Sequence, residues 1–193
     1  CAQTYFQFHK VKMDTATGAV VSVGMCSELG PVLAGLMLTG RVGASMAAEL
    51  GTMKVTEQID ALRTLATHPV DYLVVPRVLG TLVAAPLLTI ESVFVGIAAS
   101  YLVGVHLLGI DGAYYLANMQ RLTDPPDVIM GLIKAVIFGA IISTVSCYKG
   151  LGCRGGAEGV GRATTESVVM ASISILVVNF FLTLLLNRIF LTL

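Results

Sequence analysis

The chain has 193 residues, of which 55% are hydrophobic and only 12% are charged. Twelve Lys and Arg residues balance twelve Asp and Glu residues, so the formal net charge is zero. A soluble domain carries about 25% charged residues, so this composition excludes an ordinary soluble protein and predicts an integral membrane protein. The absence of a basic excess argues against a nucleic-acid partner. The length suits one helical bundle without a second domain.

Four segments are apolar enough to cross a bilayer, which takes about 20 residues per helix. We predict these spans at residues 18–39, 74–105, 131–147 and 168–193. The second segment is longer than a span needs, and we expect tilt, a kink at Pro86 or an extension beyond the membrane. The predicted fold is an all-α integral membrane protein, a polytopic helical bundle with four spans in this chain.

The distribution of Lys and Arg predicts the orientation, because basic residues in short loops stay on the cytoplasmic side. The connections after the first and third spans are basic, with Arg41, Lys54, Arg63 and Arg77 in one and Lys149, Arg154 and Arg162 in the other. Residues 106–127, between the second and third spans, carry Arg121 against three aspartates. We therefore predict that the two basic connections are cytoplasmic and that both chain ends lie outside.

An external amino-terminal end normally follows a signal or a preceding span. Cys1 is not a start methionine, and we expect residues 1–8 to be the remnant of an earlier helix. Lys10 and Lys12 would then lie outside, against the trend of basic residues. A lipidated Cys1 is the alternative, although it lacks an upstream lipobox.

Between the first two spans lies a polar segment with a helical pattern, residues 40–69. Gly40 and Gly43 predict a tight, flexible exit from the membrane, and Thr52 is placed to cap a new helix. Pro69 is expected to end that helix at His68. Its apolar positions recur every three or four residues, at Val55, Ile59, Leu62 and Ala66. This stripe fits an amphipathic helix on lipid headgroups and equally a cytoplasmic coupling helix that docks on a motor subunit.

Six sequence blocks follow one another between Ser27 and Val169: SELGPVLAGLMLTGRVGASMAAELGTMKVTEQIDAL, HPVDYLVVPRVLG, PLLT, LVGVHLLGID, LIKAVIFG and CYKGLGCRGGAEGVGRATTESVV. In this order they resemble the MlaE (YrbE) permeases of bacterial lipid-transport ABC systems, which are related to the permease of the chloroplast inner envelope. The resemblance implies five transmembrane helices preceded by an interfacial helix. Residues 1–193 would then be a single permease domain that lacks the interfacial helix and most of the first span.

By this resemblance, the chain is expected to be a permease subunit, not an enzyme, that moves phospholipids or related lipids between the bacterial inner membrane and the periplasmic or outer-membrane side. Two copies would form a homodimer around a lipid cavity. A separate ABC ATPase subunit would bind ATP and Mg, so no cofactor is expected in this chain. A STAS-domain protein would bind the ATPases, and a hexameric MCE-domain protein would sit outside.

The resemblance also places functional residues. The coupling region would be residues 49–65, with candidate contact residues Glu49, Lys54, Glu57, Asp60 and Arg63. The wall of the lipid cavity would include Met25, Ser27, Glu28 and Leu29. Many family members carry arginine at the position of Ser27, so a role of that arginine in binding the headgroup phosphate does not transfer to this chain.

Ionisable residues inside spans are functional candidates, because each costs about 3 kcal/mol on insertion scales. Glu28 would contact a headgroup or pair with Lys134, and we expect structural pairing for Glu91 and Lys134. Asn179 stands in the last span where relatives often carry aspartate. Its amide can bond between helices but has no charge, so proton-linked chemistry is not expected there.

Small residues recur at four-residue spacing at Gly96, Ser100, Gly104, Gly139 and Ser143. They predict close helix packing inside the bundle, or a dimer seam as the alternative.

The glycine-rich residues 150–161 have the spacing of a dinucleotide-binding loop, but they follow a membrane span instead of a β-strand. Arg162 and Ala163 replace the Lys-Ser/Thr pair of a phosphate loop, so nucleotide binding by this chain is not expected. The three histidines lack metal-ligand spacing, so no metal site is expected. Cys147 and Cys153 flank a turn expected to be cytoplasmic, where a disulfide is disfavoured.

Two other functions remain open on the residues alone. An ion- or proton-coupled carrier would use Glu28, Glu91 and Lys134 as its relay. A purely structural anchor for the external ring would hold no lipid in the bundle.

Overall fold

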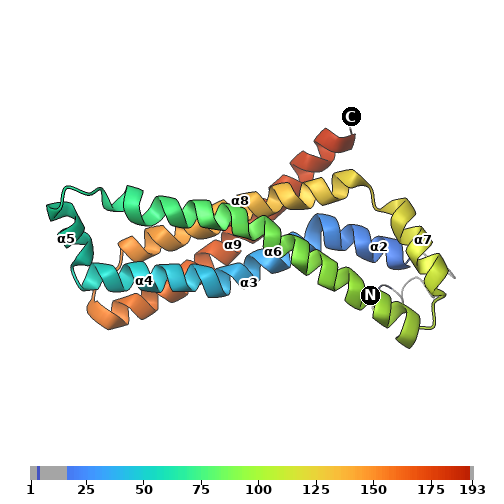
Figure 1. The fold of residues 1–193 in the computed structure, drawn as a ribbon, viewed down its shortest axis with the longest axis horizontal. Helices are drawn as coiled ribbons and strands as arrows, with labels where there is room; N and C mark the ends of the chain where they lie inside the picture. The colour runs from blue at the N-terminus through green and yellow to red at the C-terminus, as the bar shows by residue number, and fades with distance from the viewer. Residues whose placement is uncertain (1–3, 5–16, 192–193) are drawn as a thin grey trace.

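The computed structural model describes Thr4 and residues 17–191, which form a bundle of long helices (Figure 1). No β-strand occurs among these residues, and the predicted all-α fold is confirmed. Four helical stretches are long and apolar enough to cross a membrane: Thr17–Val55, Val70–Leu107, Pro125–Leu151 and Gly156–Ile189. They confirm the four predicted spans. The predictions for residues 1–8, Lys10 and Lys12 lie outside the described residues.

The first two stretches are built from α-helices joined without a break by π-helical segments. The first contains α2 (Thr17–Gly24), Met25–Leu29, α3 (Gly30–Leu38), Thr39–Gly43 and α4 (Ala44–Val55). The second contains Val70–Val74, α6 (Val75–Leu102) and Val103–Leu107. A π-helical turn takes in an extra residue, so it changes the direction in which the following side chains point. Pro86 lies inside α6, which continues through it.

The remaining helices are α5 (Gln58–Thr64), α7 (Gly112–Leu122), α8 (Pro125–Leu151) and α9 (Gly156–Leu191). Figure 1 shows α5 and the turn between α8 and α9 at one end of the bundle, with α2 and α7 at the other. The two basic connections therefore share one end. That this end is cytoplasmic stays a prediction from the distribution of charge.

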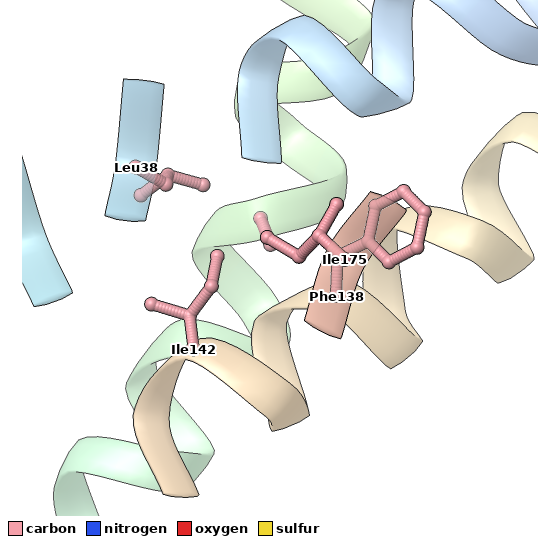
Figure 2. Close-up of a cluster of buried hydrophobic side chains, with 5 residues drawn as sticks. Leu38, Phe138, Ile142 and Ile175 are labelled. Carbon is pink, nitrogen blue, oxygen red and sulfur yellow. The ribbon is translucent and has the colours of Figure 1, made fainter. Parts of the chain in front are cut away.

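The core lies where α8 crosses α3, α6 and α9. Leu38, Ala85, Phe138, Ile142 and Ile175 form one buried cluster, and Figure 2 shows four of them converging from α3, α8 and α9. In a membrane, helix association depends on close packing more than on removal of apolar surface from water. Each member of this cluster is at most 6% exposed, and the members come from all four helical stretches. The four stretches therefore meet at this cluster.

Glycines allow α8 to approach its neighbours closely. A Cβ atom added at Gly139 would lie 2.9 Å from the carbonyl oxygen of Thr81 in α6. One added at Gly150 would lie 2.8 Å from the Cβ of Leu50 and 3.0 Å from the carbonyl oxygen of Ala47, both in α4. The predicted close packing inside the bundle is thereby confirmed for Gly139.

The tight, flexible segment predicted at Gly40 and Gly43 is wrong, because the helix runs through both residues to Val55. Gly43 lies against Ser146 and Ile142 of α8, and Gly51 lies against Cys153 and Val160 near the start of α9. Together with Ala47, which is fully buried, these residues recur every four positions and present one narrow face to the bundle. That face holds α4 against α8 and α9 as a continuation of the first helical stretch.

The predicted helix start at Thr52 is also wrong, since Thr52 lies inside α4 and its hydroxyl donates to the carbonyl of Ala48. The chain reverses instead at Glu57, which has a left-handed φ of 59°. The shorter α5 ends at Thr64, four residues before His68.

The turn also divides the predicted apolar stripe. Ile59 is buried and Leu62 half-buried, whereas Val55 and Ala66 are exposed. The stripe therefore does not form one continuous apolar face.

Gly150→Ala should lower the free energy of unfolding by about 1–3 kcal/mol, because the added methyl group overlaps α4. Gly80→Ala is the matched control, since nothing lies within 4 Å of its added Cβ and alanine favours a helix. The measurement is thermal unfolding in detergent, followed by a thiol-reactive dye that reports exposure of the buried Cys26, Cys147 and Cys153. Equal melting temperatures for the two variants would contradict the close approach of α8 and α4.

Candidate functional site

A polar cluster joins three of the four helical stretches in their apolar region. Glu28 lies in the π-helical segment before α3, Lys134 in α8, and Asn179 and Thr183 in α9. The Nζ of Lys134 lies 2.5 Å from Oε1 of Glu28 and 2.9 Å from Oγ1 of Thr183. It also donates to the carbonyl oxygen of Ser27 at 3.0 Å. The three ammonium donors thus have three acceptors, and the Lys134 side chain is only 1% exposed.

The carboxylate of Glu28 is the open part of this cluster, because its side chain is 36% exposed. Its Oε2 accepts a hydrogen bond from Nδ2 of Asn179 at 3.1 Å, and its Oε1 lies 2.8 Å from the hydroxyl of Thr183. The Oδ1 of Asn179 is buried without a hydrogen-bond partner in the described part of the chain. Lys134 is fully engaged, so the cluster offers acceptor atoms to a ligand and no spare lysine donor.

The predicted pairing is confirmed for Lys134 and wrong for Glu91. Glu91 is exposed and forms no ion pair within residues 17–191. It lines a groove of about 450 Å³ between α3 and α6, with apolar walls that include Leu33 and Leu88. Arg41 also lines this groove. The two carboxylates therefore have different surroundings: Glu28 is paired with Lys134, and Glu91 lines a groove without an ion pair in the described part of the chain.

The four residues predicted for a cavity wall face two directions. Met25 and Leu29 line a groove of about 480 Å³, with Gly96 and Val103 of the second stretch also in its lining. Ser27 and Glu28 are not part of that lining. Glu28 points to α8 and α9, and the hydroxyl of Ser27 donates to the carbonyl of Val23 at 2.7 Å.

The predicted coupling residues are divided between α4 and the region of α5. Oε2 of Glu49 accepts a hydrogen bond from Arg77 at 3.0 Å, which ties α4 to α6. Asp60 pairs with both Lys54, at 3.4 Å, and Arg63, at 3.2 Å. These contacts hold the turn in place within the chain.

One buried residue anchors α5 to the bundle. Ile59 is 2% exposed and packs in a cluster with Leu50, Leu73 and Cys147. Around it, Glu57 is exposed and the side chains of Arg63 and Leu65 are 64% and 74% exposed. The region from Glu57 to Leu65 is thus a protrusion with a fixed base and a free outer surface.

Thr183, which bridges Lys134 and Glu28, was not among the residues predicted for a site. A signal was present in the sequence, because Thr183 follows Asn179 by four residues and therefore shares its helix face. The ion pair of Arg77 with Glu49 was not predicted either, and its two residues are 28 positions apart.

Lys134→Met should destabilise the bundle by about 3 kcal/mol, because it leaves the Glu28 carboxylate without its cation. The double variant Lys134→Met with Glu28→Gln should recover most of this loss, since no unpaired carboxylate then remains. Thermal unfolding of the two single variants and the double variant gives the coupling free energy. Additive effects would show that the pair contributes nothing to stability.

Comparison with known proteins places the chain among transport permeases. A family model described as Permease MlaE matches residues 1–185. A probable ABC transporter permease protein of Rickettsia conorii is 50% identical over 181 residues, which cover 94% of this chain and 70% of that protein. A probable ABC transporter permease protein of Synechocystis is 45% identical over 168 residues, covering 87% of this chain and 64% of that protein.

A plant protein is also similar. The chloroplastic protein TRIGALACTOSYLDIACYLGLYCEROL 1 of Arabidopsis thaliana is 40% identical over 176 residues, covering 91% of this chain and 50% of that protein. The family match spans nearly all of the chain, and its residues include the Glu28 cluster and the region of α5. The chain belongs to the MlaE family of ABC transporter permeases.

Proposed function

We propose that this multi-pass ABC permease moves phospholipids or related lipids between the bacterial inner membrane and the periplasmic or outer-membrane side. The observation that carries the proposal is the Glu28 cluster, a polar site in the apolar part of the bundle that is closed toward α8 and partly open at its carboxylate. A lipid needs an apolar path for its chains and a polar contact for its headgroup, and this chain provides both.

The grooves supply the apolar surface. One is lined by Met25 and Leu29, and the other is lined by Leu33 and Leu88. Both flank the first helical stretch, which also carries Glu28. Acyl chains against these walls would leave a headgroup within the same region of the membrane as the polar cluster.

The cluster favours a headgroup that donates hydrogen bonds. The group that a ligand can reach is the exposed part of the Glu28 carboxylate, whose oxygens are acceptors. Hydroxyl or ammonium groups would suit them, whereas a bare phosphate would meet a negative charge. The Arabidopsis relative bears the name of a galactolipid, whose sugar hydroxyls are donors of this kind.

Partner ATPase subunits would bind ATP and Mg and power transport, with the protrusion around α5 as their docking element. Two permease copies would form a homodimer, and the open side of the Glu28 carboxylate would face the cavity between them. A STAS-domain protein on the ATPases and a hexameric MCE-domain protein outside would complete the assembly.

The helix geometry supports a mechanical link between docking and lipid movement. Glu28 and Lys54 lie on the same unbroken helical stretch, Thr17–Val55. At 1.5 Å per residue, about 40 Å separates them along the helix. A displacement of α5 would therefore move α4 and could reach Glu28 through the π-helical segment Thr39–Gly43 without a flexible loop between them.

The alternative of an ion- or proton-coupled carrier receives no support from the arrangement. Its relay requires Glu28, Glu91 and Lys134 to be within reach of one another. Glu91 instead lines the α3–α6 groove, away from the ion pair in which Glu28 and Lys134 are engaged.

Glu57→Asn combined with Arg63→Gln should reduce ATP-driven lipid transfer about tenfold while the ATPase subunits retain basal hydrolysis. Asparagine tolerates the left-handed backbone of position 57, so the turn should keep its shape while two exposed charges are removed. Glu158→Gln, an exposed change at the same end of the bundle, is the control and should leave transfer unchanged. Wild-type transfer by the double variant would rule out α5 as the coupling element.

Glu28→Gln should lower the amount of lipid that co-purifies with the intact permease complex about fivefold, because a charged acceptor is lost. Native mass spectrometry in mild detergent measures the retained lipid. Glu91→Gln is the matched control, as it removes the carboxylate of the other groove. An equal loss in both variants, or no loss in either, would contradict the assignment of the headgroup contact to Glu28.

A further inference from the structure

A second polar site lies at the turn between α8 and α9, at the same end of the bundle as α5 (Figure 1). It is a hollow of about 530 Å³ whose polar lining comes from the last turns of α8, the turn itself and the first turns of α9. The charged and aromatic residues of this lining are Tyr148, Lys149, Arg154, Arg162 and Glu166. None of them takes part in the Glu28 cluster.

The hollow carries three cations and one carboxylate. Glu166 accepts from Nζ of Lys149 at 3.0 Å through Oε2 and from Nε of Arg162 at 2.9 Å through Oε1. Arg154 is exposed and forms no ion pair within residues 17–191. The lining therefore has a formal charge of +2, from three positive charges and one negative charge.

Hydrogen-bond donors remain available there. Arg162 engages Glu166 through Nε alone, which leaves its two terminal nitrogens, and its side chain is 82% exposed. Arg154 contributes a second guanidinium. Guanidinium groups match the oxygens of phosphate in both charge and geometry.

The glycine-rich turn brings these donors together. Gly155 and Gly156 adopt left-handed φ values of 94° and 69°, which allow the chain to reverse directly from α8 into α9. A Cβ at Gly159 would overlap the carbonyl oxygen of Arg154, so only glycine permits Arg154 to pack against the first turn of α9. The same glycines that do not form a nucleotide loop thus shape one wall of the hollow.

The length of α8 would place the hollow at the depth of lipid headgroups if the helix spans the bilayer. Helix α8 has 27 residues and is about 40 Å long, close to the full thickness of a bilayer with its headgroup layers. Lys149 is in the last turn of α8, and Tyr148 beside it is 70% exposed, as is common for aromatic residues at the membrane surface.

We propose that this basic hollow binds the phosphate of an anionic phospholipid from the cytoplasmic leaflet. Basic pockets between helices at the cytoplasmic surface hold such headgroups by charge attraction and hydrogen bonds. The inference goes beyond the proposed transport function and does not depend on it. The hollow presents donors and net positive charge, whereas the Glu28 cluster presents an acceptor, so the two sites favour different groups of a lipid.

The test uses the intact permease in discs of phosphatidylcholine with and without phosphatidylglycerol. Native mass spectrometry counts the phosphatidylglycerol molecules retained by each protein. Arg154→Gln with Arg162→Gln should weaken this binding about 25-fold, since each surface cation contributes about fivefold. Glu166→Gln should strengthen it about fivefold, a gain that simple structural damage would not produce.

Arg121→Gln is the matched control, because it removes an exposed cation at the opposite end, in α7. Phosphatidylglycerol binding by the double variant equal to that of the wild type, or an equal loss in the control, would overturn the proposal. A parallel titration of inorganic phosphate in phosphatidylcholine discs separates the sources. If the double variant lost the binding of inorganic phosphate but kept that of phosphatidylglycerol, the hollow would be a phosphate site. The lipid would then be overturned as its ligand.

Loss of the ATPase subunit from the double variant, with phosphatidylglycerol binding unchanged, would assign the hollow to that protein and overturn the lipid proposal. Purifying the complex through a tag on the permease and measuring subunit content in the same samples gives this readout. Thermal unfolding of each variant verifies that the bundle is intact.

Discussion

The ion pair between Lys134 and Glu28 is the constraint on which the rest of the bundle depends. A lysine in the middle of an apolar helix is tolerated only when its charge and all its donors are matched. Here the acceptors come from the first stretch, through Glu28 and the Ser27 carbonyl, and from α9, through Thr183. One ammonium group therefore fixes the rotation of α8 and the position of two neighbouring stretches, and the apolar cluster around Phe138 packs in the register that results.

The first helical stretch connects this constraint to the opposite end of the molecule. It carries Glu28 in its first third and Lys54 near its end, and the small residues between Gly43 and Gly51 hold it against α8 and α9. Its two π-helical segments are the places where the backbone departs from regular α-helix. Such segments often occur at functional sites, and here one contains Glu28 while the other lies between Glu28 and the protrusion around α5. The same helix can thus both bind and transmit movement.

The two polar sites differ in a way that follows from their surroundings. In the apolar region, the buried Lys134 is fully matched, and the remaining exposed charge is the carboxylate. At the α8–α9 turn, Lys149 and Arg162 share the Glu166 carboxylate, and the exposed Arg154 adds a further positive charge at the end of the bundle. An excess of positive charge is tolerated at this end of the bundle, whereas in the membrane interior an unmatched charge would be strongly destabilising.

The sequence by itself determined the class, the four spans, the residues with intramembrane charge and the family resemblance, because hydropathy, charge and motif order are local properties of the chain. Only the tertiary structure decided that Lys134 pairs with Glu28 and not with Glu91, a choice between partners 106 and 43 residues away. It also decided that Met25 and Leu29 face a groove while Glu28 faces the bundle, since a π-helical turn shifts the helical period. Helix α4 continues past the helix start predicted at Thr52, and the chain turns at Glu57 instead. The packing of Gly43, Ala47 and Gly51 stabilises this longer helix, and it depends on contacts with helices that are distant in the sequence.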